Sequence, residues 1–406
     1  MHEHEIYSFT SNSSSLAFSG GELKTKETDS DNGYGVRVLN KDRLGFCHCQ
    51  KESDIKKAIE EAKTASKFSV KSKFSFAPKS SFTAPNIFDK SVDPVDFSSL
   101  KSVVDETKDA AESNGGRSRV IHSLGVSSVS IENTSGFFGE YSKSMLSLYA
   151  ECMHGDGFGF AYYSSTGGKL LASEIGLKAA NMAKDMRGAK KPESGNYLLV
   201  VEIEALESIL GPLLSSFSGD WKRRGITKVT KTKMFSDTLS IHEDGLASAA
   251  DARPFDDEGT PSKRKKIVEK GKVNSFFYDR ETAALENVSE SGQCSRDAYS
   301  SLPGIGSSNI IIEKGNCKDL AEFGKHIELI SAHGSHTANL TSGDIGLEVS
   351  TAFLVENGKK NPLKGFMLSA NIFDLFANIE AIELKQKIHG SLIAPRIAFK
   401  NVKVIS

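Results

Sequence analysis

The sequence predicts an α+β protein, with an N-terminal α/β domain at residues 1–190 and a largely antiparallel, β-rich C-terminal domain at residues 195–406. Three observations support this fold class. Strand-like and helix-like segments alternate through the first half. The polar, proline-containing segment 190–195 is the best linker candidate. Strand patterns with glycine-containing turns then recur through the second half, and the length of 406 residues favours two domains.

The N-terminal half opens with strands and turns. Turn signals near Gly33 and Asp42 accompany strand-like segments at residues 36–38 and 44–46. Because the second turn lies directly between the two segments, the pattern predicts a hairpin.

Two further strands and three helices are expected in the rest of this half. The strands cover residues 126–131 and 144–149. Ser53 or Asp54 can cap the first helix. Each helix places apolar or small side chains on one face. In chain order, these faces hold Ile55, Ala58, Ile59 and Ala62; Leu100, Val103, Val104 and Thr107; and Leu171, Ile175, Ala179, Met182 and Met186.

The second half opens with an apolar strand at residues 197–201. A helical segment follows, in which Pro212 should either kink the helix or mark its true start. Strands are expected at residues 310–312 and 347–355, and a final helix near 371–382. The apolar faces of these two helices hold Leu206, Ile209, Leu210, Leu213 and Phe217, and then Ile372, Leu375, Phe376 and Ile379.

Charge and hydropathy argue against several classes of protein. The 51 Lys and Arg residues against 52 Asp and Glu residues leave a net charge of -1, so nothing favours a nucleic-acid partner. No segment approaches the ~18 apolar residues of a membrane-spanning helix, and the first residues lack the pattern of a secretory signal. The 5 cysteines are scattered, which fits free thiols in a reducing cytoplasm. We therefore expect a cytoplasmic protein with no membrane partner.

Three sets of segments are more specific than composition. They lie at residues 255–261 (FDDEGTP) with 266–271 and 278–283; at 341–344 with 353–359; and at 33–38 with 44–46. In sequence and in order, they resemble the TldD/PmbA family of cytoplasmic peptidase subunits. A chance match to one set is plausible, whereas a chance match to all three is not.

The resemblance implies a system that degrades or trims unstructured peptides. In the catalytic branch of the family, a HExxxH motif and a cysteine near the C-terminus hold zinc, and the motif's glutamate activates a zinc-bound water. Here the matching positions are Leu210, Gly211 and Ser215. Leu and Gly have no side-chain donor, and Ser is a poor zinc ligand. The last cysteine is Cys317, and residues 392–396 occupy the region of the late motif.

The chain therefore resembles the PmbA/TldE branch, with no catalytic residues and no cofactor of its own. The resemblance implies that zinc resides in a TldD-like partner subunit, and that the chain pairs with such a subunit or with itself as a homodimer. Unfolded peptides would be held by β-addition, through main-chain hydrogen bonds. Two alternatives stay open: a stand-alone peptidase with a non-standard metal site, and a binding or regulatory protein of the gyrase-modulator type.

His333 and His336 are the candidate ligands for a non-standard metal site. Gly334 between them weakens a helical arrangement, and no carboxylate is spaced to assist them. We therefore favour two ordinary loop histidines.

A cluster of carboxylates, Asp256, Asp257 and Glu258, precedes Gly259. These side chains could bind a cation or the amino terminus of a peptide substrate. The alternative, which we favour, is a tight acidic turn whose carboxylates cap backbone N–H groups.

Overall fold

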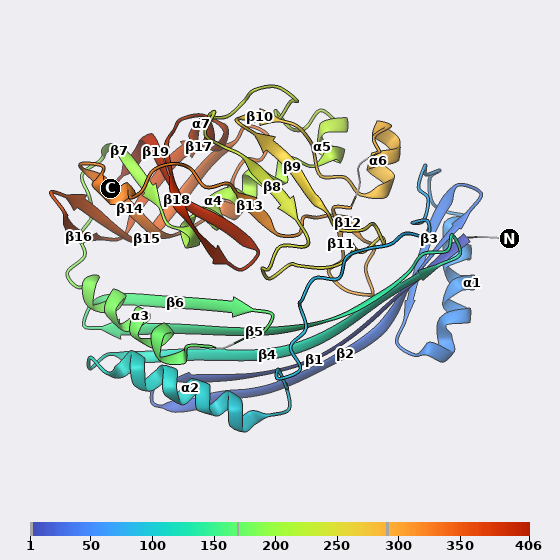
Figure 1. The fold of residues 1–406 in the computed structure, drawn as a ribbon, viewed down its shortest axis with the longest axis horizontal. Helices are drawn as coiled ribbons and strands as arrows, with labels where there is room; N and C mark the ends of the chain where they lie inside the picture. The colour runs from blue at the N-terminus through green and yellow to red at the C-terminus, as the bar shows by residue number, and fades with distance from the viewer. Residues whose placement is uncertain (1–2, 169, 290–291) are drawn as a thin grey trace.

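The computed structural model describes residues 3–168, 170–289 and 292–406. Within them, the strands form two large sheets and one two-stranded sheet. Figure 1 shows the first sheet as a long, curved layer with helices α2 (Phe97–Glu112) and α3 (Ala172–Asp185) on one face. The C-terminal half of the chain lies over the other face. The predicted α+β class, with largely antiparallel β structure, is confirmed.

The first sheet contains six strands in the order β3-β2-β1-β4-β5-β6, and all neighbours pair antiparallel. The strands are β1 (Glu3–Ser19), β2 (Glu22–Asn40), β3 (Arg43–Cys49), β4 (Arg117–Asn133), β5 (Phe138–His154) and β6 (Gly157–Ser165). The predicted hairpin is confirmed by the pairing of Val38 with Gly45. The strands predicted at residues 126–131 and 144–149 are parts of much longer strands.

The three helices predicted in this half are confirmed. Helix α1 (Ile55–Ser66) packs on β2 and β3, while α2 and α3 share a core with β1, β4, β5 and β6. The predicted cap of α1 is wrong. Because residues 52–54 already form a 3₁₀ turn, Asp54 has a helical backbone and its side chain makes no capping hydrogen bond. Asp96 does cap α2, by accepting a hydrogen bond from the N–H of Ser99 at 3.1 Å.

The second large sheet contains eleven strands and is mostly antiparallel, with parallel pairings of β13 with β19 and of β7 with β14. The strands are β7 (Gly195–Val201), β8 (Ile241–Asp244), β9 (Arg264–Glu269), β10 (Lys272–Val273), β13 (Ile310–Ile312), β14 (His326–His333), β15 (Asp344–Glu356), β16 (Lys359–Leu363), β17 (Phe366–Asn371), β18 (Ile379–His389) and β19 (Leu392–Ile405). The small sheet pairs β11 (Cys294–Ser295) with β12 (Gly304–Ile305).

Helix α4 (Ile203–Ser215) packs its apolar face into the main core of this half. The helix runs through Pro212, so the alternative that Pro212 starts the helix is wrong. The C-terminal half also contains two short helices, α5 (Gly219–Arg223) and α6 (Arg280–Glu286). In the described part of the chain, no helix combines the length and apolar character needed to cross a membrane.

The final helix is shorter than predicted. Helix α7 (Ile372–Ala377) begins after Asn371, whose side chain accepts hydrogen bonds from two backbone N–H groups of the first turn. Ile379, predicted to lie on the helix, instead starts β18 and pairs with Phe399 of β19. An apolar residue at this spacing suits both structures, so periodicity could not separate them.

Candidate functional site

Helix α4 carries the three positions at which the zinc motif of the resembled family would fall. Leu210 is 2% exposed and packs in the core of the C-terminal half. Gly211 and Ser215 lie on the exposed side of the helix, where the hydroxyl of Ser215 donates a hydrogen bond to the carbonyl oxygen of Gly211 at 3.1 Å. None of these three side chains is a zinc ligand of the usual kind.

A cavity of ≈ 440 Å³ lies beside the C-terminal half of α4. Gly211 and Ser215 line it, together with Trp221 of α5, Phe277 and Ile305. Among the described residues that line this cavity there is no His, Cys, Asp or Glu. Because zinc sites in proteins use those four residue types, the side chains here do not fit a zinc ion. Across the described ranges, no group of three or more such residues is arranged to hold a metal.

The segment 392–396, in the region of the family's late motif, takes part in a network of ion pairs. Arg396 of β19 forms ion pairs with Glu202 at 3.3 Å, with Asp319 at 3.0 Å and with Glu383 of β18. Glu202 is the residue that precedes the first turn of α4. The strand that would supply the late ligand therefore anchors the start of the motif helix.

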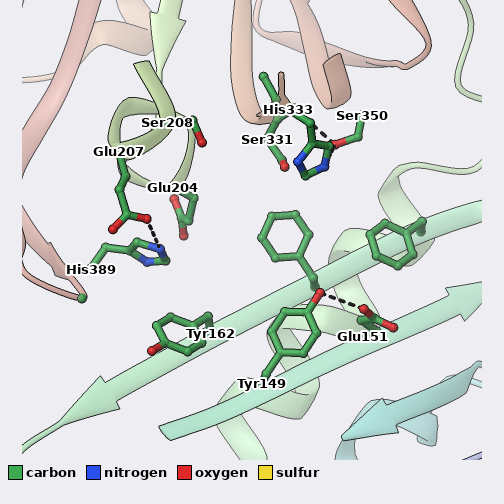
Figure 2. Close-up of a pocket in the computed structure, with 14 residues that line it drawn as sticks. Tyr149, Glu151, Tyr162, Glu204, Glu207, Ser208, Ser331, His333, Ser350 and His389 are labelled. Carbon is green, nitrogen blue, oxygen red and sulfur yellow. Dashed lines mark hydrogen bonds and ion pairs between the residues drawn. The ribbon is translucent and has the colours of Figure 1, made fainter. Parts of the chain in front are cut away.

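A larger cavity, of ≈ 630 Å³, lies between the curved sheet and the C-terminal half, and we call it the cleft (Figure 2). Figure 2 shows Tyr149 of β5 and Tyr162 of β6 on one side of the cleft. Glu204 and Glu207 of α4, and His333 at the end of β14, lie on the other side. The cleft therefore draws residues from β5, β6, α4, β14 and β15, and from the end of β18.

The carboxylates of the cleft have well-defined partners. Tyr149 donates its hydroxyl hydrogen to Glu151 at 2.9 Å, and burial together with Glu151 raises the pKa of Tyr149 to about 12. Burial alone would raise the pKa of Glu204, but Lys178 at 3.2 Å, the backbone and His389 lower it below its ordinary value. The tyrosine hence stays neutral near pH 7, and Glu204 stays ionised.

The two histidines proposed as alternative metal ligands occupy different environments. His333, at the end of β14, lines the cleft, and its Nε2 lies 3.4 Å from the hydroxyl of Ser350. His336 lies in the 3₁₀ turn Ser335–Thr337 and is not among the residues that line the cleft. The left-handed backbone of Gly334, with φ 103°, ends the strand between them.

The acidic turn is buried, and its carboxylates bond to protein groups. The Oδ1 atom of Asp256 accepts hydrogen bonds from the N–H groups of Glu258 at 3.0 Å and Thr260 at 2.8 Å. Asp257 accepts one from the N–H of Arg296 at 2.7 Å. Gly259 has φ +76°, and a side chain there would meet the ring of Phe137. The carboxylates of Asp256 and Asp257 thus cap backbone N–H groups in and beside the turn.

The same turn binds the curved sheet through buried charges that sequence reasoning missed. Arg37 of β2 lies 2.7 Å from Glu5 of β1 and 2.7 Å from Glu258. Arg296 lies 3.2 Å from Glu5. Burial alone would lower the pKa of Arg37, but Glu5 and Glu258 raise it above its ordinary value. We call these four residues the charge cluster.

Family models of the PmbA/TldA metallopeptidases match the chain in three blocks. Domain 1 matches residues 4–66, the central domain matches 90–187 and the C-terminal domain matches 194–406. An uncharacterized protein of Methanocaldococcus jannaschii is 28% identical over 98% of this chain and 95% of its own length. A metalloprotease of Methanothermobacter thermautotrophicus is 22% identical over 93% of this chain and 87% of its own length.

Two solved structures share the fold over almost the whole chain. TldE from Thermococcus kodakarensis superposes with a TM-score of 0.92 at 19% identity, covering 100% of this chain and 97% of its own. A Thermotoga maritima protein, described as a proposed modulator of a DNA gyrase, superposes with a TM-score of 0.92 at 21% identity, covering 99% and 96%. At these identities, the likeness concerns the fold alone.

Proposed function

Because the chain belongs to the PmbA/TldA metallopeptidase family, we propose that it is a PmbA/TldE-type subunit that lacks the catalytic zinc site of its peptidase system. The observation that carries this proposal is the cavity beside Gly211 and Ser215. At the place where the family motif would put its zinc ligands, the lining consists of apolar groups and serine hydroxyls. Such a surface cannot activate a water molecule for peptide hydrolysis by zinc chemistry.

The proposed subunit pairs in the cytoplasm with a TldD-like subunit that carries zinc, or with a second copy of itself. The structural likeness to a TldE protein supports a role of this kind. The substrates would be unfolded peptides, held in an extended conformation. Strand β6 supports this mode of binding, because it is an edge strand of the first sheet and lines the cleft with Phe158, Phe160 and Tyr162.

Mixing the purified chain with a zinc-bearing TldD-type subunit tests this function. We expect the two to co-elute in size-exclusion chromatography and to hydrolyse an unfolded peptide faster than either protein alone. The matched control is a partner whose general-base glutamate is replaced by glutamine, which should abolish hydrolysis in the mixture. Hydrolysis that persists with that control, or the absence of both co-elution and activation, would contradict the proposal.

A further inference from the structure

The cleft combines negatively charged side chains with an aromatic surface. Glu151 comes from β5, whereas Glu204 and Glu207 come from successive turns of α4. Of the 14 residues lining the cleft, all of them in the described part of the chain, none is a lysine or arginine. The lining therefore carries three carboxylates from two distant segments and no fixed positive charge.

Basic residues do approach two of these carboxylates from outside the lining. Lys178 lies 3.2 Å from Glu204, and Arg119 lies 3.7 Å from Glu151. Both basic side chains are about half exposed, so water screens them and they neutralise the cleft only in part. In the described part of the chain, Glu207 forms its ion pair with His389, with its Oε2 atom 3.5 Å from Nε2 of the histidine, and the side chain of Glu207 is itself about half exposed.

Aromatic rings form the side of the cleft opposite α4. Tyr149, Phe158, Phe160 and Tyr162 all project from β5 and β6. The ring of Tyr162 meets that of His389 edge-on, with 5.3 Å between their centroids, and His389 lies between Tyr162 and Glu207 (Figure 2). Aromatic faces attract cations, and they do so best where carboxylates are close and water is partly excluded.

We propose that the cleft binds a positively charged group of a peptide: the side chain of lysine or arginine, or the terminal ammonium. The inference rests on the proposed function for the identity of the ligand as a peptide. The volume of ≈ 630 Å³ is sufficient for such a group together with neighbouring backbone. Glu207 and Tyr162 are the recognition residues, because they line the cleft from α4 and β6 and both contact His389. The chain thereby adds a charge preference to main-chain binding that is otherwise indifferent to sequence.

The binding of short labelled peptides to the full-length protein alone tests this site. Unstructured decapeptides with a central Lys, Arg, Gln or Glu, each with a free or an acetylated N-terminus, would be compared by fluorescence anisotropy. We expect Lys and Arg to bind about tenfold more tightly than Gln, as roughly one favourable cation contact implies. Loss of affinity on acetylation alone would identify the terminal ammonium as the bound group.

Two variants connect the preference to the cleft. Glu207→Gln and Tyr162→Leu should each reduce the preference for Lys over Gln by about fivefold while leaving the Gln peptide unaffected. Glu322→Gln, an exposed carboxylate outside the cleft, is the matched control and should retain the preference. Equal binding of all peptides, no binding of any peptide, or an unchanged preference in Glu207→Gln would overturn the proposal. Because the peptide-binding assay contains no TldD-like subunit, a negative result in it can be told apart from a failure of the proposed pairing with such a subunit.

Discussion

At the scale of single residues, Arg37 connects the acidic turn to the curved sheet. Its guanidinium group is almost fully buried between two carboxylates, one from β1 and one from the acidic turn. It also lies over the ring of Phe74, 4.7 Å from the centroid. Burying these charges is costly unless each keeps its partners, so the charge cluster holds the turn against the sheet.

Replacing Arg37 by methionine should therefore destabilise the protein strongly. Two buried carboxylates, Glu5 and Glu258, would lose their principal partner, and we expect a loss of about 3–5 kcal/mol of unfolding free energy. Urea denaturation followed by circular dichroism measures this change. Lys57→Met, which removes an exposed i, i+4 pair with Glu61, is the control and should have little effect. Equal effects of the two substitutions would show that the charge cluster is not a major constraint.

The raised pKa of Asp256 should make the free energy of unfolding depend on pH. Burial and the neighbouring Glu258 raise its pKa to about 7. The folded protein therefore keeps the proton on Asp256 up to pH ~7, whereas the unfolded chain releases it near pH ~4. The stabilisation that comes from this bound proton is complete below pH ~4 and is lost as pH rises through ~7.

Asp256→Asn tests that dependence, because asparagine is permanently neutral and its side-chain oxygen can still accept the two backbone hydrogen bonds. Denaturation at several pH values should show the variant gaining stability relative to the parent between pH ~4 and ~7. If the difference in unfolding free energy between variant and parent stays constant from pH ~4 to ~7, the raised pKa of Asp256 is contradicted.

Sequence reasoning recovered part of this residue-scale picture. The acidic turn was predicted from Asp256, Asp257, Glu258 and Gly259, because turn chemistry is local. Arg37 was not predicted to be its partner, since 221 positions separate Arg37 from Glu258 along the chain. Charges that meet only through tertiary packing leave no short-range pattern.

At the scale of elements, α4 is the helix on which the zinc motif of the family would fall. The helix keeps its apolar face in the core, while Gly211 and Ser215 lie on its exposed side. A glycine in a helix interior weakens it, and a side chain at Gly211 would meet no atom within 4 Å apart from its chain neighbours and the backbone of the helix. The next residue is Pro212, whose ring crowds the Cβ atom of a helical residue before it.

Since these two effects oppose each other, Gly211→Ala should change the unfolding free energy by less than ~1 kcal/mol. The matched control is Gly176→Ala in α3, where the added methyl group would collide with the backbone of α2 at Thr107. That substitution should lower the unfolding free energy, and thermal or urea denaturation compares the two. Equal destabilisation by the two substitutions would show that Gly211 is as tightly constrained as Gly176.

Elements with a long periodic pattern were predictable, and their ends were not. The apolar faces of α2, α3 and α4 identified these helices correctly. The final helix was predicted too long because Ile379 continues the helical period but pairs with Phe399 in the sheet. Whether an apolar residue joins a helix or a neighbouring strand depends on which strand lies beside it, and that partner is distant in sequence.

For the whole molecule, the sequence predicted the α+β class and the family resemblance but not the cleft. Its lining combines Tyr149, Glu204, His333 and His389, which lie on separate elements of both halves. His333 was considered as a candidate metal ligand but interpreted as an ordinary loop histidine, whereas Glu204 and Glu207 were not noticed. Their significance depends on how the curved sheet faces α4, and no local pattern encodes that arrangement.

The central claim is that this chain does not carry the peptidase's zinc. The most direct measurement is the zinc content of the purified chain, determined by elemental mass spectrometry together with an assay of peptide hydrolysis. We predict far less than one zinc ion per chain and no hydrolysis by the chain alone. One zinc ion per chain, with hydrolysis that a chelator removes and zinc restores, would contradict the account.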